Sequence, residues 1–130
     1  MISSPLLIVA SVLFVISVNA CNKPTESSAV VTLEYEITPQ PVIIGSSTLQ
    51  LSLADSSRQP VRGASITVEA NMSHGGMAPV VAQTIETAPG RYQTILNLTM
   101  AGDWIFLTHI TLASGQKLER QLDVKGVLPR

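Results

Sequence analysis

The chain has 130 residues and a formal net charge of −1, with 45% hydrophobic and only 13% charged residues. This length accommodates one domain plus a short targeting segment. The near-neutral charge argues against a nucleic-acid-binding protein, which usually carries a basic surface. The single cysteine excludes an internal disulfide framework and any paired-cysteine redox or zinc site.

The first predicted element is a secretory signal. Residues 6–18 form the uncharged run LLIVASVLFVISV. A transmembrane helix needs roughly 20 apolar residues, so this shorter run fits the apolar core of a signal peptide better. The run is followed by Asn19-Ala20-Cys21, which resembles the lipobox of bacterial lipoproteins. That resemblance implies cleavage after residue 20 and a lipid on Cys21 that anchors the chain to a bacterial membrane. The alternative is a free cysteine buried at the end of an anchor helix.

Polar residues follow the cysteine and predict a flexible tether. Residues 22–29 read NKPTESSA, a composition that buries too little apolar area to order itself. We therefore expect a signal peptide at 1–20, a lipidated cysteine and tether at 21–29, and a folded domain at 30–130. The domain would face the periplasm or the exterior of the cell envelope.

From residue 30 onward, apolar residues recur with a period of two, which is typical of β-strands. Gly, Pro, Asp and Ser clusters separate the alternating segments, and no useful helical run follows the signal. The pattern predicts an all-β fold, an immunoglobulin-like β-sandwich of about seven strands, with Trp104 as core anchor. The apolar sets expected to share one strand face are Leu33, Tyr35 and Ile37; Leu49, Leu51 and Leu53; Ile66, Val68 and Ala70; Val81 and Ile85; Tyr92, Leu96, Leu98 and Met100; Trp104, Phe106, Ile110 and Leu112; Leu118, Leu122 and Val124.

Four phrases along the domain resemble one family. They are Gly45 followed by LQLSLAD (49–55), QPVRGA (59–64), MSHGGMAP (72–79), and PGRY (89–92) with MAGDW (100–104). In this order they are similar to the YtkA-like domain family, which resembles FixH-type periplasmic domains. The resemblance spans roughly residues 33–124 and implies a small extracytoplasmic β-sandwich without a catalytic activity. FixH relatives are associated with copper delivery or maturation of haem-copper oxidases, which implies an envelope or oxidase-assembly protein as partner.

One segment carries residues suited to metal chemistry. Met72, His74 and Met77 surround Gly75-Gly76, and thioether and imidazole ligands suit Cu(I). Met100 would join them if the end of its strand lies beside this loop. His109 is the other histidine, and the sequence does not place it near His74.

A structural interpretation of the same methionines stays open, because methionine fills irregular gaps in protein cores. Met100 is in phase with Leu96 and Leu98, so core packing is its expected role. No nucleophile elbow, metalloprotease motif or nucleotide-binding loop occurs. We therefore expect a membrane-tethered, non-enzymatic accessory domain that handles copper. The alternative is a structural or protein-interaction module of an envelope or respiratory complex without metal.

Overall fold

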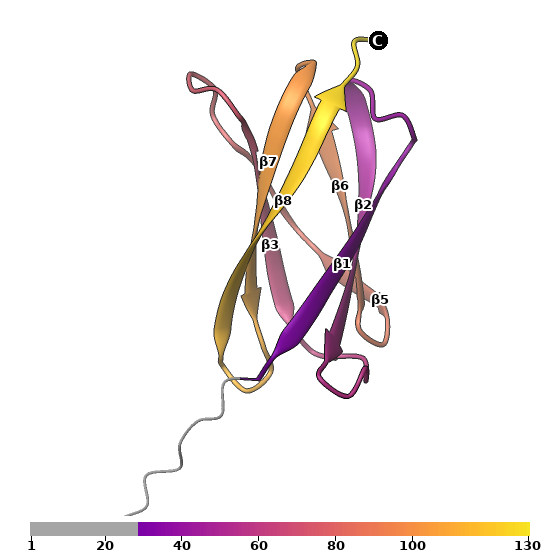
Figure 1. Ribbon diagram of the computed structural model, residues 1–130, viewed down its shortest axis with the longest axis vertical. Coiled ribbons are helices and arrows are strands. Elements are labelled where there is room, and N and C mark those ends of the chain that lie inside the picture. Colours follow the sequence, from indigo (N-terminus) through magenta and orange to yellow (C-terminus); the bar gives the residue numbers. More distant parts are fainter. Residues whose placement is uncertain (1–28) are drawn as a thin grey trace, which may run out of the picture.

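The computed structural model describes residues 29–130. These residues form eight β-strands in two sheets that face each other (Figure 1). The strands are β1 (Val31–Thr38), β2 (Gly45–Asp55), β3 (Ser65–Met72), β4 (Val80–Gln83), β5 (Ile85–Ala88), β6 (Arg91–Leu98), β7 (Gly102–Thr111) and β8 (Lys117–Val127). The expected signal peptide, Cys21 and all of the tether before Ala29 lie outside the described residues. Over residues 29–130 the search for a helix able to span a bilayer found none.

Both sheets are four-stranded and antiparallel. One has the order β1-β2-β6-β5 and the other the order β4-β3-β7-β8. The expected all-β sandwich is therefore confirmed. Inward-facing residues of the two sheets form one hydrophobic core, and the largest fully buried side chains are those of Trp104, Tyr92 and Phe106. Trp104 is thus the core anchor that alternation in the sequence predicted.

The count of eight strands differs from the expected seven because the segment around Val81 and Ile85 divides. Thr84 donates both its N–H and its hydroxyl to the carbonyl of Ile66, at 3.0 and 3.1 Å. These two bonds hold the end of β4 on β3, and the chain then crosses to pair with β6 as β5. The segment therefore supplies one short edge strand to each sheet.

Tyr35 also departs from the expected pattern. Alternation places it with Leu33 and Ile37, yet its side chain is 44% exposed. The reason is that β1 is an edge strand beside β8 of the other sheet, where the Tyr35 hydroxyl donates to the carbonyl of Asp123 at 3.1 Å. Tyr35 therefore bridges the open seam between the sheets instead of filling the core.

A carboxylate on β5 joins two connections near one end of the sandwich. Glu86 of β5 accepts hydrogen bonds from the N–H groups of Gly63 and Gly90, both at 3.2 Å. The Gly63 hydrogen bond is the largest cause of a lowered pKa at Glu86, and the Gly90 hydrogen bond adds to it. Both glycines adopt a positive φ, 70° and 71° respectively, as their turn positions require.

The two ends of the sandwich carry different parts of the chain. At the end that we call the entry end, the N–H of Ala29 donates to the side-chain oxygen of Gln116 in the β7–β8 connection. At the opposite end, the distal end, lie the β3–β4 loop (73–79), the β6–β7 connection (99–101) and the carboxyl terminus (Figure 1). The 10 residues of β7 run between the two ends, a span of about 33 Å.

Candidate methionine and histidine site

The β3–β4 loop with His74 and Met77 and the β6–β7 connection with Met100 lie at the same end of the sandwich (Figure 1). The N–H of Ser73 donates to the carbonyl of Asp103 at 3.0 Å, directly after the β3–β7 ladder ends at the Met72–Trp104 pair. This bond continues the sheet hydrogen bonding by one residue beyond the strand. The structure therefore brings the two sequence segments proposed for the site to the same end of the fold.

Met72 sits at the base of the loop and belongs to the core. Its side chain is only 9% exposed, and its terminal methyl lies 3.5 Å from where a Cβ on Gly102 would be. Its register partner on β7 is Trp104. The core role that the sequence left open for Met72 is therefore confirmed.

Met77 and Met100 are the exposed thioethers of the distal end, at 43% and 40%. The core packing expected for Met100 is wrong. Strand β6 ends at Leu98, so the alternation does not extend to residue 100. The main chain there is fixed instead, because the Trp104 indole N–H donates to the Met100 carbonyl at 3.0 Å.

The two histidines lie at different places. His74 is exposed in the distal loop, whereas His109 pairs with Glu119 on β8, toward the entry end. The His109 ring contacts two carboxylates, with Nδ1 3.1 Å from Glu119 and Nε2 3.5 Å from Glu69. His109 therefore does not join the distal loop; it links three strands on the outer face of their sheet.

The side chains that the sequence proposed as metal ligands at the distal end are thioethers and one imidazole. Within residues 29–130, no three side chains of histidine, cysteine, aspartate or glutamate are grouped so that they could hold a metal ion. Thioethers prefer Cu(I), whereas carboxylates and water prefer harder ions.

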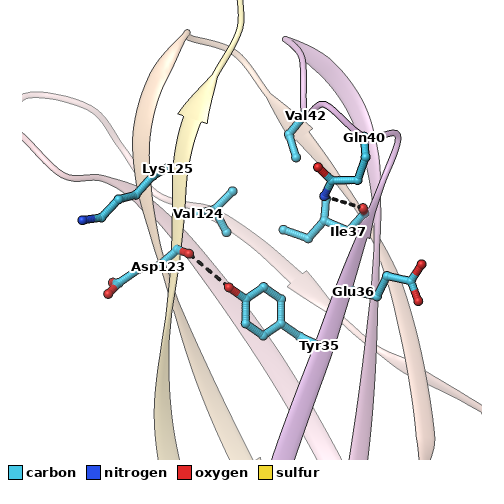
Figure 2. Close-up of a pocket in the computed structure, with 8 residues that line it drawn as sticks. All are labelled: Tyr35, Glu36, Ile37, Gln40, Val42, Asp123, Val124 and Lys125. Atoms are coloured by element: carbon cyan, nitrogen blue, oxygen red, sulfur yellow. Dashed lines mark hydrogen bonds between the residues drawn. The ribbon is translucent and has the colours of Figure 1, made fainter.

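A hollow of about 360 Å³ lies on the seam between β1 and β8. Figure 2 shows Ile37, Val42 and Val124 pointing into the gap between the strands, with the Tyr35–Asp123 hydrogen bond below them. The charged side chains of its lining, Glu36, Asp123 and Lys125, point outward (Figure 2).

The sequence did not predict this hollow because β1 ends at Thr38 and β8 begins only at Lys117, so the two strands are far apart in the chain. Alternation assigns faces within a strand but says nothing of which edges meet. A signal was nevertheless present in Tyr35, an aromatic residue with a polar tip on a strand rich in glutamate.

Comparison with known proteins places the chain in a family. A search of curated proteins found no match to the chain. Among solved structures, the chain is similar to the soluble domain of PmoD from a Methylocystis species (Rockwell), with a TM-score of 0.49 and 11% sequence identity. The similarity covers 78% of this chain and 92% of that chain. The YtkA-like family model matches residues 27–109, and the chain therefore belongs to the YtkA-like family.

Proposed function

We propose that this chain is a non-enzymatic accessory domain of the cell envelope that binds Cu(I) at its distal end. His74, Met77 and Met100 would provide the exposed ligands, and the largely buried Met72 would lie at the base of the loop. The domain would pass the ion to an envelope or oxidase-assembly protein by exchange of ligands.

The observation that carries this proposal is the Ser73–Asp103 hydrogen bond of 3.0 Å. It joins the base of the loop that contains His74 and Met77 to the start of β7, so that this loop and the connection with Met100 lie at the same end of the domain although more than 20 residues separate them in the chain. Without this juxtaposition, the loop would offer one imidazole and one thioether, too few ligands for a specific soft-metal site.

Exposure of the ligands supports transfer rather than storage. Met77 and Met100 are each about two-fifths exposed, and His74 is also exposed. A partner's ligands can approach an ion held by such side chains and replace them one at a time. A buried structural site, by contrast, would enclose the ion with all of its ligands.

The place where the N-terminal segment joins the domain indicates on which side the ion would be transferred. A lipid on Cys21 would hold the entry end toward the membrane, because Ala29 is bonded to Gln116 there. The distal loop would then point away from the lipid surface. The proposed partner therefore presents its metal ligands outside the bilayer.

The test is an anaerobic Cu(I) titration of the full chain, purified in mild detergent, against a chromophoric chelator that binds Cu(I). We expect the wild type to withdraw one equivalent of Cu(I), and the variant H74Q/M77L/M100L to lose that competition. Equal and negligible retention of Cu(I) by both proteins would refute the proposal.

Two variants serve as matched controls. H109Q removes the other histidine at a site far from the loop, and we expect it to bind Cu(I) as the wild type does. M72L conserves the core volume and therefore measures whether the Met72 sulfur is a ligand. Loss of Cu(I) binding in H109Q would show that the ion lies elsewhere on the domain.

A metal-free interaction module is the second candidate, and one observation favours it. Ile85 of β5 and Ile95 of β6 are 73% and 63% exposed. Because Ile85 pairs with Gln93, the two isoleucines are diagonal neighbours on the outer face of the sheet. Chemical cross-linking to envelope proteins tests this second function. If it holds, the variant I85T/I95T will lose the cross-links, whereas H74Q/M77L/M100L will keep them with or without a copper chelator.

A further inference from the structure

The three methionines of the distal end differ sharply in their access to solvent. Met77 and Met100 are 43% and 40% exposed, whereas Met72 is 9% exposed. Two-electron oxidants convert a thioether to a sulfoxide, and the rate follows the access of the oxidant to the sulfur. The three sulfur atoms therefore differ in reactivity although they lie at the same end of the domain.

We propose that Met77 and Met100 form an oxidant-sensitive pair, and that their conversion to sulfoxide switches off Cu(I) binding at the distal end. The second half of this inference rests on the proposed function. The oxidant is a small two-electron oxidant such as hypochlorous acid. The sulfur first takes up chlorine and gives it two electrons, water then adds its oxygen to the sulfur, and chloride leaves, so that the net products are the sulfoxide, chloride and a proton.

The fold would survive this reaction because neither exposed sulfur belongs to the core. Met100 supports the core through its main-chain carbonyl, which accepts the Trp104 indole N–H, and a sulfoxide leaves that bond in place. Met72 is the opposite case. A polar sulfoxide on Met72 would lie within the core beside Gly102 and Trp104, where burial of an unpaired polar group is unfavourable.

The metal affinity would fall because a sulfoxide presents a hard oxygen where the thioether presented a soft sulfur. Only His74 would then remain as an exposed soft-metal ligand in the loop. Because methionine sulfoxide reductases reverse the reaction, the loss of Cu(I) binding is reversible as long as Met72 stays reduced.

The experiment treats the full chain in mild detergent with one to five equivalents of hypochlorous acid. Peptide mass spectrometry reads the gain of about 16 Da at each methionine, and Met72 is the internal control. We expect Met72 to react roughly fivefold more slowly than Met77 and Met100, in proportion to its exposure. Thermal unfolding of the oxidised chain should match that of the untreated chain, and its Cu(I) retention should fall until a reductase restores it.

Each outcome decides one part of the inference. The claim that the core protects Met72 would be refuted if Met72 were oxidised as fast as Met77 and Met100. The claim that the fold survives would be refuted if the domain unfolded as Met77 and Met100 were oxidised. Unchanged Cu(I) retention after complete oxidation of Met77 and Met100 would overturn the switch while leaving the proposed function intact. An untreated chain that retains no Cu(I) would overturn the proposed function and the switch together, and the order of oxidation would still be decided by the mass spectra.

Discussion

Gly63 and Gly90 allow the cost of a steric clash to be separated from the cost of backbone conformation. Both have a φ of about 70°, and both donate their N–H to Glu86. A Cβ on Gly63 would lie 3.6 Å from Ala113 Cβ, an ordinary contact. A Cβ on Gly90 would lie 2.7 Å from Pro60 Cβ and 2.8 Å from the Leu53 carbonyl oxygen.

We expect Gly63→Ala to cost about 1 kcal/mol, the lower end of the penalty for a left-handed L-residue. Gly90→Ala carries the same penalty plus that of forcing a group into a filled space, typically 1–3 kcal/mol, so we expect about 3 kcal/mol in total. The clash is with backbone and a proline ring, which cannot rotate away. The Leu53 N–H, which donates to the Gly90 carbonyl at 2.9 Å, would also be displaced.

Urea denaturation followed by fluorescence of Trp104, the one tryptophan, measures both variants against the wild type. A difference of about 2 kcal/mol between the two alanine variants would measure the clash itself. Equal losses of stability in the two variants would refute the reasoning, because their backbone angles are the same and only the space for Cβ differs.

Three further predictions concern polar groups of the scaffold. Glu86→Gln should destabilise the fold at pH 7. The pKa of Glu86 is lowered from its usual 4.5, mainly by the Gly63 hydrogen bond, so the ionised carboxylate stabilises the folded state above pH 4.5, and this contribution is lost as the pH falls through the lowered folded value. The urea midpoints of the wild type and Glu86→Gln should therefore converge in acid. A gap between the midpoints that stays constant with pH would contradict this. Ser47→Ala should stabilise the fold by about 1 kcal/mol, because the buried Ser47 hydroxyl has no hydrogen-bond partner among residues 29–130. Thr108→Val is the contrast: the Thr108 hydroxyl donates to the Arg120 carbonyl at 2.8 Å, and its loss should destabilise the fold. Tyr92→Phe should lower the free energy of unfolding by about 2 kcal/mol, measured by thermal unfolding, because the Tyr92 hydroxyl donates to the Val61 carbonyl and accepts from the Ala64 N–H. An unchanged melting temperature would show that water replaces both hydrogen bonds.

The alternation of apolar and polar residues correctly predicted the buried side chains wherever a strand is continuous and buried on one face. Leu49, Leu51 and Leu53 are buried as a set, and Trp104 and Phe106 are buried with them. The reason is that a period of two follows directly from the strand geometry, which depends on neighbouring residues only.

The errors arose where long-range structure overrides the local pattern. Met100 continues the period of β6, yet the strand ends two residues earlier. Tyr35 faces a seam because its strand is an edge, and Thr84 divides a segment because of a bond to Ile66. For the candidate site, the sequence identified the loop with His74 and Met77, but its place at the same end as the Met100 connection depends on the pairing of β3 with β7.

The division of one segment between the two sheets also affects how the protein behaves when crowded. Strands β4 and β5 form one edge of each sheet and are only four residues long, so they offer few unpaired backbone groups to another chain. The other two edges, β1 and β8, are long but carry charged side chains such as Glu34, Glu36 and Lys117. Many copies gathered on one surface would therefore resist joining edge to edge into fibrils, and a lengthened, uncharged β5 would remove part of that protection.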